Sequence, residues 1–456
     1  MWHSMLQMLL SLVGILITIF FIIGIHEFCH FLAARLLGIK VLRFSIGFGK
    51  VLWRSRDKQG TEYVISLLPL GGYVKMLDET EEPVAAYEKP YAFNNQPFYK
   101  KFLVVIAGPL SNIVAAFFLY WLIFVIGFSA PVPLIGTIAP HSIAAEAGLK
   151  TQEEIVSVDG QSTQSWLAAL MRIFVHIGDN DHMRITLQNP NTHAQKTYTL
   201  NLTNWHVDPL QPEPLQSLGI TPYEPLIPLV IGIISPESPA ALSGLKIGDK
   251  IIAINKKPIT HWEQVLTIVS EHPSRLLTFA VEREKQVITV VVTTGYQRTL
   301  SLHKVGYLGI GPNVELPANL LRHIQYSPVA AVPRAWQEIS DFVQFNFMSI
   351  AKLLEGKISL QSLGGPITIF TSAGTAINYG IVPFLSFLAF LNIAIGVINL
   401  LPIPGLDGGH IVFQVIEAVI GRPVPLSIQM FCYRLGFIFL LFIILQAIAN
   451  DVMRLL

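Results

Sequence analysis

The stretch His26-Glu27-Phe28-Cys29-His30 is an HExxH motif, and it lies inside a long apolar run from Met8 to Leu37. On a helix, two histidines four residues apart share one face and can bind one zinc ion. The glutamate after the first histidine stands where a general base is needed. Ionisable side chains are costly inside a membrane segment, so their presence there indicates function. The pattern predicts a zinc site with His26 and His30 as ligands and Glu27 as the base.

The composition of the whole chain is that of a membrane protein. Of its 456 residues, 52% are hydrophobic and only 13% are charged. This length allows two to four domains, and the chain is too apolar to be wholly soluble. The formal net charge of +1 gives no argument for binding nucleic acid, and we expect none. Cys29 and Cys432 both lie in apolar segments, so no disulfide framework is predicted.

Four segments are long enough to span a bilayer, which takes about 20 apolar residues. These predicted spans are 8–37, 102–128, 381–404 and 430–449. The loop after the first span is rich in arginine and lysine, so the positive-inside rule places it in the cytoplasm. Both termini and the long segment 129–380 would then lie outside the cytoplasm.

An internal repeat occupies the outer segment. IGTIAPHSIAAEAGLK from Ile135 matches IGIISPESPAALSGLK from Ile231 at a constant spacing. Runs of β-branched residues between Gly, Asn and Pro turns predict a β-rich unit with a short helix in each copy. The copies close on Leu218-Gly219-Ile220 and on Leu308-Gly309-Ile310. The pattern resembles PDZ domains, which add a peptide to a sheet edge and capture its terminal carboxylate. Peptide-binding grooves and filled spacer domains are equally compatible with it.

Helical spacing begins after the repeats, from Leu320 to Leu354. Apolar residues recur there every three or four positions, namely Trp336, Ile339, Val343, Phe347, Ile350 and Leu354. We expect amphipathic helices that pack against the membrane or against the two β-rich units.

A catalytic zinc ion usually has three protein ligands and a fourth position for water. Asp407, which follows the third span, is the candidate for the third ligand. A helix from Met8 to Ile25 is ~27 Å long, which brings His26 toward the cytoplasmic side of a ~30 Å hydrocarbon core. The third span runs inward, so Asp407 emerges on the same side.

Asp407 also has a second interpretation. It precedes a predicted helix from His410 to Ile420, and aspartate commonly caps the first turn of a helix. Beside an HExxH motif we favour the role of metal ligand. His410 is a weaker candidate ligand.

Together these motifs resemble the site-2 protease family over essentially the whole chain. The resemblance rests on HEFCH, on the LDG of 406–408, on the two repeats, and on Gly108-Pro109, Asn112, Gly365-Pro366, Asn399, Pro402 and Pro404. It implies an α-helical membrane protein with four transmembrane helices, a membrane-associated β-hairpin and two extracytoplasmic α+β PDZ domains. It also implies that zinc is held by His26, His30 and Asp407, and that Glu27 activates the water.

The resemblance further implies where a substrate binds. Asn399, with Pro402 and Pro404, would contact the substrate strand, and a hairpin at 62–76 containing Tyr73 and Val74 would offer it a sheet edge. Substrates would be transmembrane segments of single-pass proteins, among them an anti-sigma factor already trimmed on its outer side in envelope stress signalling, and remnant signal peptides. The protein would lie in a bacterial inner membrane, with periplasmic PDZ domains and an active site toward the cytoplasm.

The expected divisions of the chain follow from these assignments. They are the first span (1–37), the hairpin loop (38–101), the second span (102–128), two PDZ domains (129–224 and 225–314), an amphipathic region (315–380), the third span with LDG (381–409), and a cytoplasmic helix with the fourth span (410–456). Peptide C-termini are possible ligands of the PDZ domains, and the lipid bilayer is the surrounding partner.

Three alternatives stay open. Family members commonly have glycine where this chain has Cys29, whose thiol could reach the metal but more often would pack against a neighbouring helix. A non-enzymatic adaptor with a structural zinc would need a closed set of four ligands, whereas the sequence offers three. A membrane-anchored protease of soluble substrates would carry HExxH in a polar domain and not in a span.

Overall fold

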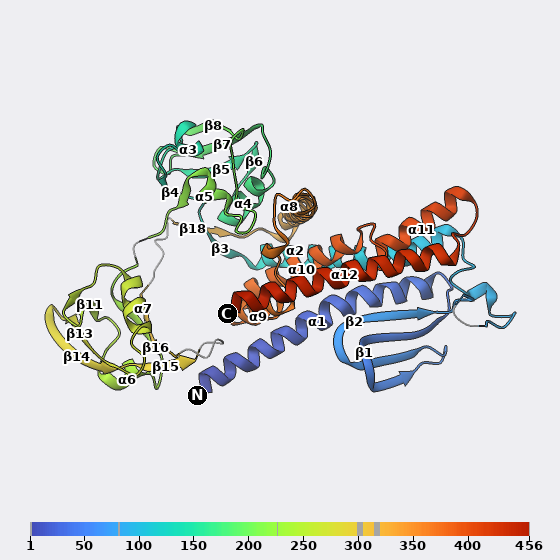
Figure 1. Cartoon of the computed structure of the whole chain (residues 1–456), viewed down its shortest axis with the longest axis horizontal. Coiled ribbons are helices and arrows are strands. Elements are labelled where there is room, and N and C mark those ends of the chain that lie inside the picture. The colour runs from blue at the N-terminus through green and yellow to red at the C-terminus, as the bar shows by residue number, and fades with distance from the viewer. Residues whose placement is uncertain (1, 81–82, 226, 299–303, 314–319, 456) are drawn as a thin grey trace.

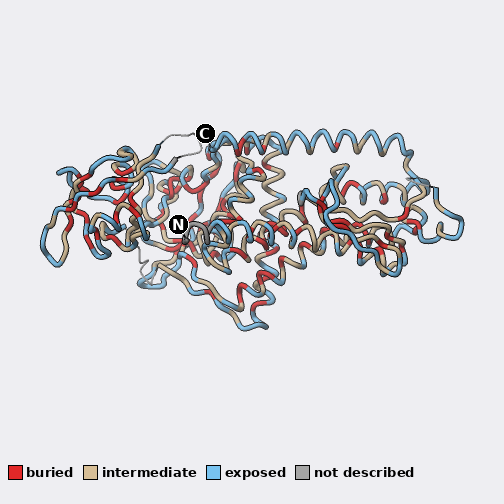
Figure 2. The backbone as a smooth tube through the Cα atoms, turned by 90° about the horizontal axis from the view of Figure 1, so that it is seen from below, coloured by how far each residue is buried: buried red, intermediate tan, exposed pale blue. Residues whose placement is uncertain are grey.

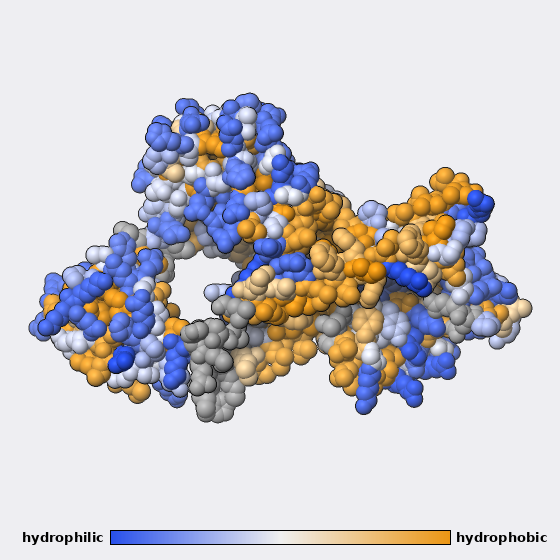
Figure 3. Space-filling model, in the orientation of Figure 1, coloured by the Kyte–Doolittle hydropathy of each residue, from blue (hydrophilic) through white to orange (hydrophobic). Residues whose placement is uncertain are grey.

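The computed structural model describes residues 2–80, 83–225, 227–298, 304–313 and 320–455, without the side chains of 2–7, 69, 70 and 298. Long apolar helices lie together in one part of the molecule, and two β-rich units lie beside them (Figure 1). The surface over these helices is largely hydrophobic (Figure 3). Such a surface is suited to lipid and not to water.

All four predicted membrane spans are confirmed as helices long and apolar enough to cross a membrane. They are α1 (Trp2–Leu36), α2 (Phe98–Ile126), α10 (Ile381–Asn399) and α12 (Leu426–Leu455). Helix α10 ends at Asn399 and not at 404, because Pro402 and Pro404 lack the N–H that a helix needs. Helix α12 is the most exposed span, with 6% of its apolar window buried (Figure 2).

Helix α9 (Pro366–Asn378) packs against the spans α1, α10 and α12, and its first turn is hydrogen-bonded to a side chain of α12. The buried Asp451 of α12 accepts hydrogen bonds of 2.9–3.1 Å from the N–H groups of Gly365, Ile367 and Thr368. It thereby satisfies N–H groups at a helix start that have no partner within the helix. Arg454 donates to the carbonyl oxygen of Ser362 at 2.7 Å. These two charges at the end of an apolar span therefore bind backbone groups of the segment around α9.

A two-strand sheet follows α1. Strand β1 (Val41–Arg56) pairs with β2 (Glu62–Met76), and both bend so strongly that Ser45 pairs with Tyr73 on one side and with Val64 on the other. Four segments therefore lie side by side, in the order 50–56, 62–68, 41–48 and 70–76. Phe31 of α1 packs against Phe44 and Tyr63 of the sheet, at ring distances of 5.4 and 5.7 Å.

Two β-rich units, residues 135–222 and 231–312, share the order of their elements as far as β8 and β14; before the last strand the first then has a helix and the second has two strands. The first contains β4 (Ile135–Ile138), α3 (Ile143–Glu146), β5 (Glu154–Val158), β6 (Gln161–Ser162), α4 (Trp166–Phe174), β7 (His182–Gln188), β8 (Gln195–Asn201), α5 (Pro214–Leu218) and β9 (Ile220–Pro222). The second contains β10 (Ile231–Ile234), α6 (Pro239–Ser243), β11 (Lys250–Ile254), β12 (Lys257–Pro258), α7 (Trp262–Ser270), β13 (Leu276–Arg283), β14 (Gln286–Thr293), β15 (Gly295–Arg298), β16 (Lys304–Tyr307) and β17 (Ile310–Pro312). In each unit the last strand pairs with the first.

The start of the predicted helical segment is instead a strand. Strand β18 (Leu321–Ile324) pairs with β3 (Phe128–Pro131), so the chain leaves the spans and returns to them through one small sheet. Helix α8 begins only at Pro328 and continues to Leu354, with Ser327 as its N-cap. Sequence spacing alone misses this pairing because the partner strand lies far away in the chain.

Helix α8 buries only part of the predicted apolar stripe. Ile339 is buried, and Val343 and Ile350 pack against the same core. Trp336 and Leu354 of the predicted apolar stripe are 64% and 79% exposed. The buried apolar residues are Ala331, Ala335, Ile339 and Phe342. The two alanines let α8 lie close to α2, and Phe342 stacks on Tyr120 of α2 at 5.7 Å. The close approach of the α8 and α2 backbones therefore explains why Ala331 and Ala335 are buried.

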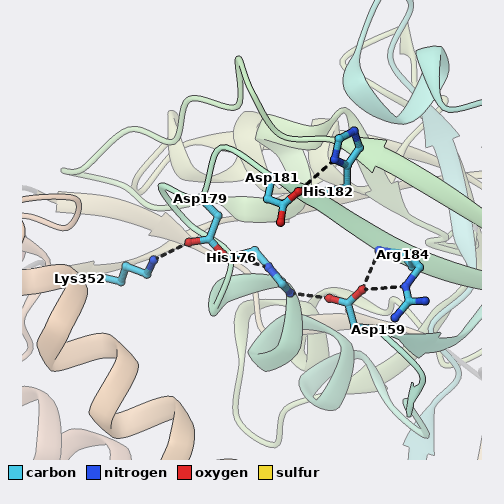
Figure 4. Close-up of polar contacts among 7 residues, drawn as sticks. All are labelled: Asp159, His176, Asp179, Asp181, His182, Arg184 and Lys352. Carbon is cyan, nitrogen blue, oxygen red and sulfur yellow. Dashed lines mark hydrogen bonds and ion pairs between the residues drawn. The ribbon is translucent and has the colours of Figure 1, made fainter.

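Charged side chains tie the first β-rich unit to α8 (Figure 4). The buried Lys352 of α8 donates to Asp179 at 3.0 Å, and Asp179 also lies 3.1 Å from Nδ1 of His176. On α4, Arg172 donates to Asp341 of α8 at 2.7 Å. The basic partners of these ion pairs are largely buried, since the side chains of Arg172 and Lys352 are 9% and 6% exposed. Removing the acidic partner of such a pair leaves a buried charge uncompensated.

Glu338 of α8 makes the contact between α8 and the first β-rich unit sensitive to pH. Burial raises the pKa of Glu338 from 4.5 to about 7, with a further rise from Asp341 that Arg172 opposes. A carboxyl group whose pKa is raised in the folded state becomes destabilising as the pH rises from its unfolded to its folded value. We expect Glu338→Gln to raise the melting temperature by a few degrees at pH 8 and to change it little at pH 5.

The measurement is thermal unfolding of the purified protein in detergent at both pH values. Glu355→Gln is the matched control, because Glu355 is an exposed residue at the end of the same helix. An equal shift at pH 5 and pH 8 would contradict the assigned cause.

Candidate metal centre

Helix α1 places the two motif histidines on one face. Their Nε2 atoms lie 3.2 Å apart, and the side chains of His26 and His30 are 12% and 10% exposed. The four-residue spacing accounts for this approach, because one helical turn takes 3.6 residues. The two nitrogens therefore point toward one small volume beside α1.

Asp407 comes to the same volume from another element. It opens helix α11 (Asp407–Ile420), and its Oδ2 lies 3.1 Å from Nε2 of His26 and 3.4 Å from Nε2 of His30. The N-cap of α11 is Leu406, and no side-chain cap hydrogen bond forms there. The alternative role of Asp407 as N-cap is therefore wrong.

The three converging atoms fit a divalent cation. Oδ2 of Asp407 is buried without a hydrogen-bond donor, and its neighbours are the two imidazole nitrogens. Ligand atoms about 2.0–2.2 Å from a tetrahedral zinc ion stand ~3.3 Å from one another. The observed separations of 3.1–3.4 Å match that value. Among the described residues, His26, His30 and Asp407 form the one group of this kind.

Helix α2 orients His30. Nδ1 of His30 lies 2.7 Å from the carbonyl oxygen of Val104 and can donate to it, which leaves Nε2 to face the cluster. Such a hydrogen bond fixes the tautomer and the ring direction of a metal-binding histidine. Gly108 supplies the space, since a Cβ there would lie 2.1 Å from Nε2 of His30. The glycine is therefore required by the histidine ring and not by backbone conformation.

Glu27 packs against the sheet. A Cβ on Gly72 would lie 2.7 Å from Cγ of Glu27, so the backbone of β2 passes directly beside this side chain. The segment 70–76, which contains Tyr73 and Val74, pairs with 41–48 on one side. It is the outermost segment of the sheet, and its other edge carries none of the described strand pairings.

The loop between α10 and α11 positions Asp407. Its backbone packs so closely that a Cβ on Gly408 would lie 2.1 Å from the carbonyl oxygen of Leu401. On Gly409 a Cβ would lie 2.5 Å from that of Ile403. The glycines after Asp407 thus let the loop fold back over the first turn of α11. Asn399, Pro402 and Pro404 belong to this loop or adjoin it, and all three are half-buried or exposed.

Two other candidates lie outside the cluster. His410 is one turn after Asp407, but its Nδ1 is 3.1 Å from the hydroxyl of Tyr433 and it is absent from the ligand group. Cys29 is a free, half-buried cysteine and is also absent from that group. The structure therefore does not place Cys29 among the converging ligand atoms, and its packing role stays a prediction.

Some parts of the site could not be found from the sequence. Val104 contributes only a backbone carbonyl, for which no residue type is diagnostic. The contact of Glu27 with Gly72 depends on how the sheet packs, although a glycine pair within a strand signals a close backbone approach. Tyr433 lies on α12, more than 20 residues from His410, and carries no motif.

The comparisons with known proteins agree with this geometry. A model of peptidase family M50 matches residues 14–443. The chain is 38% identical over 452 residues to the regulator of sigma-E protease RseP of Escherichia coli, covering 99% of this chain and all of the relative. A Vibrio cholerae relative described as a zinc metalloprotease is 39% identical over 454 residues, with the same coverage. The regulator of sigma E protease of Haemophilus influenzae is 38% identical over 451 residues, 99% of this chain and all of the relative.

The fit of Gly108 around His30 can be tested directly. We expect Gly108→Ala to lower the zinc content of the purified protein at least several-fold, because the new methyl group would displace the imidazole. Gly24→Ala is the control: it also adds a methyl group to a long apolar helix, but no atom lies within 4 Å of that position. Zinc is measured by mass spectrometry of the purified proteins. Full zinc content in Gly108→Ala would show that His30 does not need this space.

Proposed function

The chain belongs to peptidase family M50, and we propose that His26, His30 and Asp407 hold the zinc ion of this metalloprotease while Glu27 acts as its general base. The observation that carries the proposal is the convergence of three hydrogen-bond acceptors within 3.4 Å of one another, without a donor for Asp407. Bound zinc supplies a Lewis acid and lowers the pKa of a bound water to about 7.

The protein's own residues perform the proton transfers. Glu27 accepts a proton from the attacking water and passes it to the leaving amine. Val104 keeps the ring of His30 in the correct tautomer through its hydrogen bond to Nδ1. Gly72 lies beside Glu27, and its lack of a side chain leaves room for the Glu27 carboxylate between α1 and the sheet.

The proposed substrates are transmembrane segments of single-pass membrane proteins. A helical substrate hides its carbonyl groups in i→i+4 hydrogen bonds, so the segment to be cut must first unwind. The outer edge of 70–76, beside Glu27, can replace the lost hydrogen bonds by adding the substrate as a strand. Tyr73 and Val74 would then contact it from one side, and Asn399, Pro402 and Pro404 from the other.

The physiological role is proposed from the relatives. Two of them are named as regulators of sigma E, so we assign this chain to sigma-E control in the bacterial inner membrane. An anti-sigma factor already trimmed on its outer side, in envelope stress signalling, is the proposed main substrate, and remnant signal peptides are further ones. The basic hairpin loop would face the cytoplasm by the positive-inside rule, with the divisions of the chain as expected from the sequence.

The two β-rich units are proposed to be periplasmic PDZ domains that restrain cleavage. In the first, Leu218-Gly219-Ile220 is fully buried, which argues against an open peptide groove there. In the second, Leu308 is buried but Gly309 and Ile310 are half-exposed. Of the two units, the second is therefore the better candidate for docking of peptide C-termini. A size filter needs only bulk near the site, so filtering is supported better than docking.

The separate roles of ligand and base give a first test. We expect Asp407→Ala, His26→Ala and His30→Ala each to lose both zinc and cleavage. Glu27→Gln should keep most of its zinc and lose cleavage by at least 100-fold, because it removes only the proton acceptor. The assay is cleavage of a single-pass reporter in membranes, with zinc measured on the purified variants. Full zinc in Asp407→Ala would remove it from the ligand set.

A second test concerns the filter. We expect Lys352→Ala, which breaks the ion pair with Asp179, to allow cleavage of a reporter with an intact outer domain. Cleavage of the trimmed reporter should change less than two-fold. Arg184→Ala is the control, since Arg184 pairs with Asp159 within the first unit and is 66% exposed. If Lys352→Ala leaves the intact reporter uncut, the docking of this unit on α8 does not restrain cleavage.

A further inference from the structure

A row of charged side chains crosses the sheet that carries the proposed substrate edge. The strand register pairs Lys75 with Arg43, Arg43 with Glu62, and Glu62 with Arg56. Residues that face each other in neighbouring strands lie on one side of a sheet. These four side chains and Arg54 line one surface cavity of about 750 Å³. Among its described lining residues, the cavity has four basic side chains and one carboxylate, that of Glu62.

The one carboxylate among the described lining residues is already engaged. Glu62 accepts a hydrogen bond of 2.7 Å from Arg43, and its second oxygen lies 3.9 Å from Arg54. Arg54 is 76% exposed. The exposed guanidinium groups of Arg54 and Arg56 therefore give this cavity positive charge that an anion would compensate.

The position of the cavity along the membrane normal indicates which kind of anion binds there. Gly72 lies beside Glu27, and Lys75 is three residues further along the same strand, or about 10 Å. Arg35, in the last turn of α1, is paired with Asp57 of the β1–β2 turn at 2.8 Å, so this end of the sheet lies beside the C-terminal end of the helix. Leu36, where α1 ends, is nine residues or about 14 Å beyond Glu27. The charged row is thus level with the end of the first span, where hydrocarbon gives way to headgroups.

The opposite end of the sheet is apolar and exposed. Large hydrophobic side chains with exposed fractions of 37–61% gather there, namely Phe48, Val51, Leu52, Trp53, Ile65, Leu67 and Leu68. Such residues next to a basic row are typical of a surface that enters the interfacial region of a bilayer. The two ends of the sheet thus call for two different parts of a lipid, its acyl chains and its headgroup.

We propose that the cavity lined by Arg43, Arg54, Arg56 and Lys75 binds the phosphate headgroup of an anionic phospholipid. The lipid holds the sheet at a fixed depth, and with it the edge at 70–76 beside Glu27. The placement of the substrate edge rests on the proposed function, whereas lipid binding itself needs neither zinc nor cleavage. A basic residue at an anionic surface contributes about 1 kcal/mol, or roughly a five-fold change in affinity.

The test uses the full-length protein in detergent with short-chain phosphatidylglycerol as the probe. Binding is followed by native mass spectrometry and by the rise in melting temperature. The variant Arg54→Gln/Arg56→Gln removes two exposed charges and should weaken binding roughly 25-fold. The control is Arg184→Gln/Lys196→Gln, which removes two exposed charges from the first β-rich unit. Melting temperatures without lipid establish that both variants are folded.

Each outcome is decisive. Preference for phosphatidylglycerol over phosphatidylcholine, lost in the sheet variant and kept in the control, supports the site. Equal binding by both variants would overturn it. Displacement of the lipid by millimolar inorganic phosphate would also overturn it, because the site would then take free phosphate and not a lipid. Because Glu27→Gln leaves the cavity intact, it should bind the lipid normally even if the proposed catalysis is wrong.

Discussion

Oδ2 of Asp407 and the Nε2 atoms of His26 and His30 lie within 3.4 Å of one another inside an apolar helical assembly. In such surroundings a carboxylate oxygen without a hydrogen-bond donor is expensive to bury, and a bound cation removes the cost. The rest of the site follows from this convergence. Helix α1 supplies two groups through its periodicity, and α11 supplies the third through a loop that folds back on its own first turn.

Close backbone approach is the means by which this structure brings the groups together. Gly108 clears space for the ring of His30, and Gly72 brings the sheet against Glu27. Gly408 allows the loop after α10 to pack over Asp407. In all three places a side chain would meet an atom at 2.7 Å or less, so the glycines act through space and not through unusual backbone angles. The proposed substrate edge is therefore set by the same packing that orders the metal ligands.

The sequence predicted those parts that depend on local periodicity. The four spans follow from hydrophobicity over about 20 residues, and the pairing of His26 with His30 follows from the helical repeat. Asp407 was found because the direction of the third span fixes the side on which it emerges. Strand β18, the buried alanines of α8 and the carbonyl of Val104 were missed, because each depends on a partner distant in the chain. The depth and basic row of the sheet likewise required its strand register.

The most direct test of the central claim is X-ray absorption at the zinc edge on the purified wild-type protein in detergent. Two imidazole nitrogens, one carboxylate oxygen and one further oxygen are expected, all at about 2.0–2.2 Å. In Asp407→Ala the two-imidazole signature should be lost together with most of the metal. A sulfur neighbour at about 2.3 Å in the wild type would place Cys29 on the zinc ion. That result would contradict the ligand set of His26, His30 and Asp407.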